Sequence, residues 1–367
     1  MKTRKFIMTG LLLLIAALGF VSCKKDKTES PFKSSAAGIN TKGLDYYIKI
    51  AETLQSKQQP AQAEWDSLFA TPFYKLYFGA GVTTPEAQKN EMSLVYKEQT
   101  LTSEQQKQYA HHLDYKNNLS KLKSYSASVK DGSVRTELKK YLYPYLPARL
   151  QKDELIPTIY YTYYFAEEAN GLPDMILQDA LLAYKADSYA KGVLSAHEAF
   201  HSVTTASLTK RLKISLTDAA NPQSVLVNTL SGIAQEGVAD LIDKDILTNA
   251  NSPVSSQFQA LMVNEDQLSR NYISRINAAL IKYNRNEPLD NQQPVSGFAG
   301  HQPGRFMGKV IQQAGLIEEL KVDVENPFLF IYTYNKAASQ SNGMYPVLSA
   351  EAINFLKAAE QQMIKPL

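Results

Sequence analysis

The feature that most constrains this chain is the run Ser195-Ala196-His197-Glu198-Ala199-Phe200-His201, where two histidines stand four residues apart. On an α-helix such residues lie on one face, so both imidazoles can reach the same ion. Glu198 is rotated about 100° from His197, which places its carboxylate beside the ion rather than on it. The apolar residues around the histidines favour a buried helix. The run therefore predicts a helix that holds a metal ion.

Zinc suits this arrangement, because it binds histidine nitrogen at about 2.0–2.1 Å and lowers the pKa of its water to about 7. The chain has only 5 histidines among 367 residues, so a chance match is improbable. Two unrelated histidines that happen to fall four apart are the alternative.

A third ligand is expected on a second helix, predicted from apolar spacing between Val225 and Asp245. Glu236 lies within it, and Asp240 follows on the same face one turn later. The alternative is a solvated helix face or a capping network, a role that Asp243 and Asp245 could play equally well. The ligand interpretation is favoured because two histidines alone leave zinc one protein ligand short.

His197-Glu198-x-x-His201 followed by Glu236-x-x-x-Asp240 resembles the gluzincin metallopeptidases, the thermolysin-like and aminopeptidase-like group. The resemblance implies one zinc per chain, bound by the two histidines and Glu236, with Glu198 as general base. It also implies that Asp240 orients His197 by a hydrogen bond to its other ring nitrogen, as in the thermolysin branch. Ser202-Val203-Thr204 departs from the metzincin pattern, and the glycine-rich anchor of the aminopeptidases is not apparent.

Peptide hydrolysis also needs a group that stabilises an oxyanion. In gluzincins a downstream histidine or tyrosine does this, so the resemblance implies His301, with Tyr332 and Tyr334 as alternatives. His301 lies in Gly300–Gly308, where we expect a loop with a Pro-Gly turn that opens a helix. Arg305 could bind a substrate carboxylate. A structural histidine near a turn is the alternative for His301.

Residues 1–22 are expected to be a signal peptide, with a basic start and a short apolar run. Val21-Ser22-Cys23 resembles a bacterial lipobox, which implies that Cys23 is lipidated and anchors the protein to a membrane of the cell envelope. An ordinary secretory signal is the alternative. Cys23 is the only cysteine, so neither a disulfide nor a cysteine nucleophile is expected. Together with the metal motif, the chain looks similar to the zinc-dependent peptidase families of Bacteroidota lipoproteins.

Charge argues against a nucleic-acid partner. The whole chain carries +3, and removal of the signal takes away three basic residues and no acid. The polar stretch 23–42 reads as a flexible tether. The expected partners are a peptide or protein substrate and the membrane, no nucleotide or haem cofactor is indicated, and the oligomeric state is left open.

The mature chain is expected to be α+β and mainly α, with a zincin-like catalytic core. Residues 43–150 read as a helical N-terminal part and 151–367 as the catalytic part, forming one compact unit. Ile156–Phe165 and Asp174–Asp179 read as strands, separated by turn residues at Ala169–Pro173. Such a sheet, just before the metal helix, could pair an edge strand with an extended peptide. His111 and His112 are expected to be solvated surface residues.

Two classes of function follow. The first is a zinc-dependent hydrolase, most simply a metallopeptidase, with a non-peptide amide or ester as a further substrate option. The other is a non-catalytic envelope lipoprotein that binds peptide or glycan around a vestigial or structural zinc site. An open coordination position on the metal would favour the hydrolase over the binding protein, because a closed four-ligand site holds no reactive water.

Overall fold

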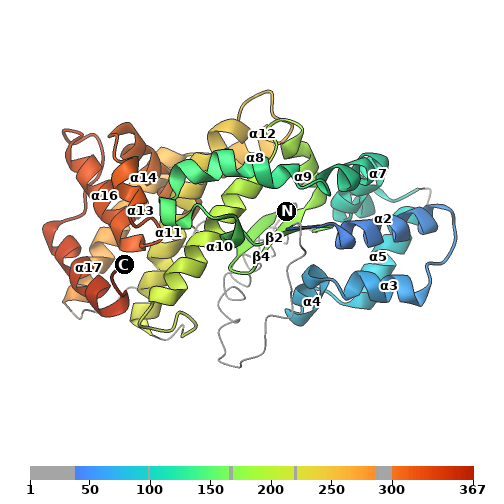
Figure 1. Cartoon of the computed structure of the whole chain (residues 1–367), viewed down its shortest axis with the longest axis horizontal. Helices are drawn as coiled ribbons and strands as arrows, with labels where there is room; N and C mark the ends of the chain where they lie inside the picture. Colours follow the sequence, from blue (N-terminus) through green and yellow to red (C-terminus); the bar gives the residue numbers. More distant parts are fainter. Residues whose placement is uncertain (1–37, 98–99, 165–167, 219–220, 286, 288–299) are drawn as a thin grey trace. The chain divides into compact units, whose positions relative to one another are not determined.

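A computed structural model describes residues 38–97, 100–164, 168–218, 221–285, 287 and 300–367 (Figure 1). The predicted signal peptide and Cys23 lie outside these residues, as does most of the predicted tether. The chain divides into two compact units. Within the described residues, the sheet unit comprises 38–138 and 157–198, and the helical unit comprises 139–156 and 199–367. The division after Glu198 falls inside one continuous helix, so that helix belongs to both units.

The sheet unit is built on four short strands, in the spatial order β1-β2-β4-β3. Their bounds are β1 Ile39–Asn40, β2 Thr158–Thr162, β3 Ala169–Leu172 and β4 Met175–Asp179. β2 pairs in parallel with both β1 and β4, and β3 pairs antiparallel with β4. β2 and β4 are buried along their whole length, and both fall inside the strands predicted from sequence.

The turn prediction at Ala169–Pro173 was wrong. Ala169 pairs with Gln178 and Leu172 with Met175, so these residues form an edge strand, and the turn is confined to Pro173 and Asp174. Asn, Gly and Pro are typical of turns, which is why this segment was predicted as one. The β4 backbone offers the segment hydrogen-bond partners, which only the tertiary arrangement reveals.

Eight helices of the described residues belong wholly or partly to the sheet unit, apart from the start of α10. They are α2 Lys42–Gln55, α3 Gln62–Phe69, α4 Pro72–Gly79, α5 Pro85–Lys97, α6 Ser103–Gln108, α7 Ala110–Val129, α8 Ser133–Leu142, which crosses into the helical unit, and α9 Ala180–Asp187. α2 packs on β2 and contacts α3, α5 and α7. Much of the core between them is aromatic, with Tyr47, Tyr74, Tyr115 and Tyr161 fully buried.

His112 belongs to this aromatic core, so its predicted surface position was wrong. The residue is 3% exposed, its ring stacks on Tyr163 at 4.3 Å, and its Nδ1 lies 2.9 Å from the Tyr47 hydroxyl. His111 is only partly exposed, and its Nε2 lies 3.0 Å from Asp179. The polar neighbours along α7 suggested a solvated face, whereas Tyr163, just after strand β2, and Tyr47 of helix α2 supply aromatic partners from distant parts of the chain.

The helical unit begins with the end of α8 and three 3₁₀ turns, η1 Tyr143–Tyr145, η2 Ala148–Leu150 and η3 Asp153–Leu155. Its remaining helices are α10 Val193–Arg211, which starts in the sheet unit, α11 Pro222–Leu247, α12 Ser255–Leu261, α13 Glu265–Asn284, α14 His301–Gln313, α15 Ile317–Lys321, α16 Pro327–Ser339 and α17 Ala350–Met363. α11 packs against α14 and α16, and α13 packs against α14 and α17 (Figure 1).

The predicted fold class is confirmed: the molecule is α+β, mainly helical, with a small sheet that precedes the His197–His201 helix in the chain. The helix predicted between Val225 and Asp245 is α11. Within the described part of the chain, no helix combines the length and apolar character needed to cross a membrane.

Candidate metal centre

Helix α10 carries the first three predicted site residues. His197, Glu198 and His201 are 3%, 5% and 9% exposed, among neighbours such as Ala199 and Phe200 that are fully buried. Residues 193–204 of α10 are all buried, so this part of the helix packs into the interior. The two histidines therefore lie one turn apart on a buried and laterally constrained helix.

The start of α10 is fixed by a glycine and a buried carboxylate. Gly192 has φ +81°, and a Cβ there would lie 2.7 Å from the Leu138 nitrogen. Its N–H donates to the Asp187 carboxylate at 2.8 Å, and the Tyr125 hydroxyl donates to the same side chain at 2.7 Å. Burial raises the pKa of Asp187. These contacts determine where the helix begins, and hence the register of His197.

Helix α11 supplies the predicted third ligand. Asn221 caps its N-terminus through the Gln223 N–H, and Pro222 occupies the first turn, where a missing N–H costs nothing. Glu236 lies in the middle of the helix, with its Oε2 3.5 Å from His201 Nε2. Asp240 follows one turn later and is fully buried.

Helix α14 approaches α11 so closely that glycine is required on both helices. A Cβ on Gly304 would lie 2.3 Å from the Ile233 carbonyl oxygen, and one on Gly308 would lie 2.4 Å from the Gly237 carbonyl oxygen. Gly300, with φ +102°, precedes the helix and would meet the Gly232 carbonyl in the same way. Glycines four apart line one face of α14, so the two backbones are in direct contact.

This contact brings His301, the first residue of α14, to the acidic face of α11. His301 Nδ1 lies 2.9 Å from Glu236 Oε2 and 3.1 Å from each carboxylate oxygen of Asp240. Burial alone would lower the pKa of His301, but the Glu236 and Asp240 carboxylates outweigh it and raise the pKa to about 10. The predicted Pro-Gly turn was wrong, because Pro303 and Gly304 lie inside the first turn of α14.

The predicted ligands come together. One ligand atom from each of His197, His201 and Glu236 can be chosen so that all lie within 4.8 Å of one another. Two imidazole nitrogens and one carboxylate oxygen form the donor set of many catalytic zinc sites, which keep a fourth position for water or substrate. The residues present therefore fit a zinc ion, although other divalent metals also bind nitrogen and oxygen donors.

Asp243 and Lys244, which the sequence analysis did not place in the site, lie next to Asp240. Asp243 and Lys244 are buried, and the lysine Nζ lies 2.9 Å from Asp243 Oδ2 and 3.1 Å from Asp240 Oδ1. Asp243 and Asp240 also form a potential ligand group with His197. The signal for Asp243 was available in the spacing, since positions 236, 240 and 243 share one helix face.

Other predicted candidates have different surroundings. Arg305 is 5% exposed and its guanidinium binds Glu265 and Asp245 at 2.6 and 2.5 Å, so it holds helices together rather than offering a site for a substrate carboxylate. Tyr334 is fully buried in α16 and donates to the Pro346 carbonyl oxygen at 2.6 Å. Burial and the nearby Glu360 charge raise the pKa of Tyr332 well above its usual value.

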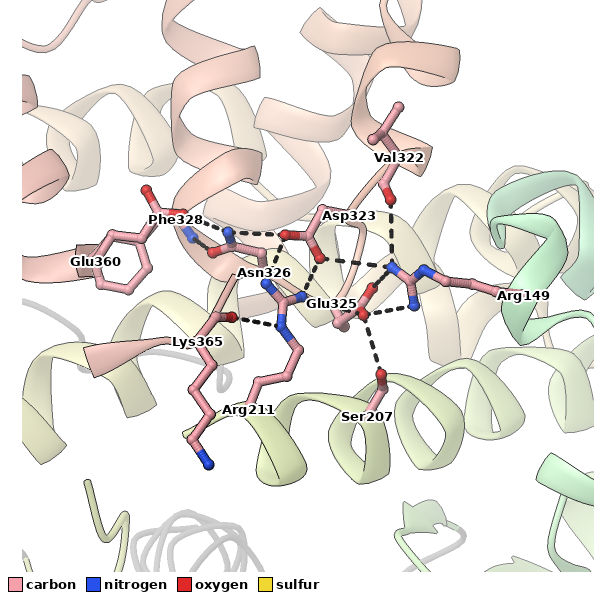
Figure 2. A network of polar contacts seen from close by, with 10 residues as sticks. All are labelled: Arg149, Ser207, Arg211, Val322, Asp323, Glu325, Asn326, Phe328, Glu360 and Lys365. Carbon is pink, nitrogen blue, oxygen red and sulfur yellow. Dashed lines mark hydrogen bonds and ion pairs between the residues drawn. The ribbon is translucent and has the colours of Figure 1, made fainter. Parts of the chain in front are cut away.

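The C-terminal half of α10 is anchored by a network of charged groups (Figure 2). Arg211 binds Asp323 and Glu325, Arg149 approaches Glu325 from the opposite side at 2.8 Å, and Ser207 donates to Glu325 at 3.1 Å. The Glu325 carboxylate is fully buried. Since Ser207 and Arg211 lie within three turns of His201, the network holds the helix that carries this ligand.

Comparison with known proteins adds one match. A model of the family described as "Putative zinc dependent peptidase (DUF5700)" matches residues 65–343, which include every predicted metal-site residue. Neither a curated protein nor a solved structure matches the chain.

Proposed function

We propose that this chain, which belongs to the family described as "Putative zinc dependent peptidase (DUF5700)", is a metallopeptidase. It would hydrolyse peptide bonds at the His197–His201–Glu236 centre. The observation that carries the proposal is the convergence of these three donors with Glu198 next in sequence to the first. A zinc ion in such a site polarises the substrate carbonyl and lowers the pKa of its water to about 7.

Charge balance supports a single divalent ion. Glu236, Asp240 and Asp243 carry three negative charges on one face of α11, and Lys244 offsets one of them. Buried charges are costly unless they are compensated. Without metal, the protonated His301 offsets a second charge; a bound dication would replace that proton, because a nearby cation favours the neutral imidazole.

The chain's own residues would perform the proton transfers. Glu198 is positioned as the general base that takes a proton from the attacking water and then delivers it to the leaving amine. His301 would stabilise the developing oxyanion. Its Nδ1 faces Glu236 and Asp240, and its Nε2, on the other edge of the ring, is the atom proposed to contact the substrate. Asp240, close to His197 and His301, would orient these rings.

Removal of the base tests the mechanism. Glu198→Gln should retain about one zinc per chain by mass spectrometry while losing nearly all hydrolysis of a fluorogenic peptide library. His201→Ala should lose both metal and activity, and Glu236→Ala should lose most of the metal. At saturating zinc, His301→Gln should lose about 10²–10³ in kcat, the usual cost of one oxyanion donor. Full hydrolysis by Glu198→Gln would refute the mechanism.

We further propose that Cys23 carries a lipid, so that the peptidase acts at a membrane of the bacterial cell envelope on peptide or protein substrates. Support comes from the basic and apolar start of the chain and from the Ser22-Cys23 pair.

A further inference from the structure

Lys244 occupies an unusual position for a lysine. It lies on α11 one turn after Asp240 and two turns after Glu236, and only 2% of the residue is exposed. Its Nζ lies 2.9 and 3.2 Å from the two Asp243 oxygens and 3.1 Å from Asp240 Oδ1. The ammonium also lies 4.8 Å from the centre of the Phe258 ring, a favourable cation–π distance. These partners compensate the large cost of burying an ammonium group.

Asp240 is consequently held from two sides. Lys244 Nζ binds Oδ1, and His301 Nδ1 lies 3.1 Å from both carboxylate oxygens. The same Nδ1 lies 2.9 Å from Glu236 Oε2. A continuous set of contacts therefore runs from Lys244 through Asp240 and His301 to the third metal donor, entirely within the helical unit.

We propose that Lys244 is a positioning residue of the metal centre, which fixes the Asp240 carboxylate so that it orients His301 and Glu236 for metal binding. The inference rests on the proposed function, because it assigns the lysine a role toward the metal. It is distinct from a structural role, in which Lys244 would do no more than neutralise the buried Asp243. Partners that orient metal ligands typically contribute 10–100-fold to metal affinity.

The test is the zinc dissociation constant of the full chain, measured by competition with a chromophoric chelator. The variants are Lys244→Gln, which keeps a hydrogen-bond donor but no charge, and Lys244→Arg, which keeps the charge in a different geometry. Lys309→Gln is the matched control, because this lysine pairs with Asp245 at 3.3 Å outside the proposed centre. Cobalt-loaded samples would report the ligand geometry through their visible absorption spectra.

We expect Lys244→Gln to weaken zinc binding 10–100-fold, Lys244→Arg to weaken it less, and Lys309→Gln to leave it unchanged. The cobalt spectrum should shift in both Lys244 variants. If both variants fold and keep the wild-type zinc affinity and cobalt spectrum, Lys244 is only structural and the inference is wrong. Should Lys244→Gln fail to fold, Lys244→Arg decides: at least threefold weaker binding supports the role, and unchanged binding overturns it.

The outcomes also separate this inference from the proposed function. A wild-type chain that binds zinc but cleaves no peptide would refute the peptidase proposal, while a weakened zinc affinity in the Lys244 variants would still support the positioning role. A wild-type chain that binds no zinc would overturn both.

Discussion

At the scale of single residues, the surroundings of a side chain determine its chemistry more than its type does. His301 and His112 show this in opposite directions. Two carboxylates raise the pKa of His301 to about 10, whereas burial lowers the pKa of His112 despite the nearby Glu91. His112 is therefore a neutral member of the aromatic core at neutral pH.

The lowered pKa of His112 predicts a loss of stability in acid. An unfolded chain binds a proton at this residue near pH 6.5, and the folded state binds it only at lower pH. Stability from His112 is thus complete above about pH 6.5 and is lost as the pH falls towards the folded-state pKa. The denaturant midpoint should drop less between pH 7.5 and pH 5 in His112→Phe, which keeps the stacking on Tyr163, than in the wild type. Equal drops would contradict the prediction.

At the scale of elements, the centre depends on how closely α14 approaches α11 and on how firmly α10 is held. Gly304 permits the close approach of α14, because the α11 backbone occupies the space where a side chain would stand. The buried Glu325 holds α10 in place through its contacts with Arg149, Arg211 and Ser207 (Figure 2). Neither residue is among the predicted ligands, yet each positions a helix that carries one of the site residues.

Gly304→Ala should separate α14 from α11. Its Cβ would lie 2.3 Å from the Ile233 carbonyl oxygen, so we expect a loss of about 1–3 kcal/mol in the free energy of unfolding and reduced peptide hydrolysis. Gly79→Ala is the control, since no atom lies within 4 Å of its added Cβ. That variant should be neutral or up to about 1 kcal/mol more stable. Thermal unfolding of both variants checks the prediction, and equal stability of the two would contradict it.

Glu325→Gln should destabilise the helical unit. Removing one charge from a buried pair leaves the other uncompensated, which typically costs about 3–5 kcal/mol. Arg211 retains Asp323 in this variant, so we expect the lower end of that range. The Glu351–Arg285 pair at the surface gives the control, because water screens this pair and Glu351→Gln should leave the free energy of unfolding almost unchanged. Denaturant unfolding distinguishes them, and a Glu325→Gln effect no larger than the control would show that the network contributes little.

At the scale of the whole molecule, a lipid at Cys23, as proposed, would determine where the proposed peptidase acts. Wild-type chain expressed in a bacterium that processes lipoproteins should fractionate with membranes and incorporate a labelled fatty acid. Cys23→Ser should be found in the soluble fraction without label, while its zinc content stays at the wild-type level, because Cys23 lies far in sequence from the metal donors. Membrane association that persists without label in the variant would exclude lipid attachment as the anchor.

The sequence by itself determined the parts of this protein that depend on local periodicity. Helical spacing predicted the faces of α10 and α11 that carry His197, His201 and Glu236, and the resemblance to the gluzincins implied that these faces meet. β-Branched and aromatic residues predicted β2, and a second strand was expected after the turn residues, where β4 lies. These patterns extend over one or two turns or a few strand residues, so a short stretch of sequence contains them.

Contacts between distant segments were decided only by the tertiary structure. The spacing of Gly300, Gly304 and Gly308 is visible in the sequence, but nothing local says that the α11 backbone lies against it. Likewise, no local pattern shows that Lys244 pairs with Asp240 or that His112 packs among aromatic rings. A polar residue in a helix is compatible with either water or a buried partner. Which of these it meets depends on the packing of elements far apart in the chain, where burial and electrostatic pairing outweigh local preference.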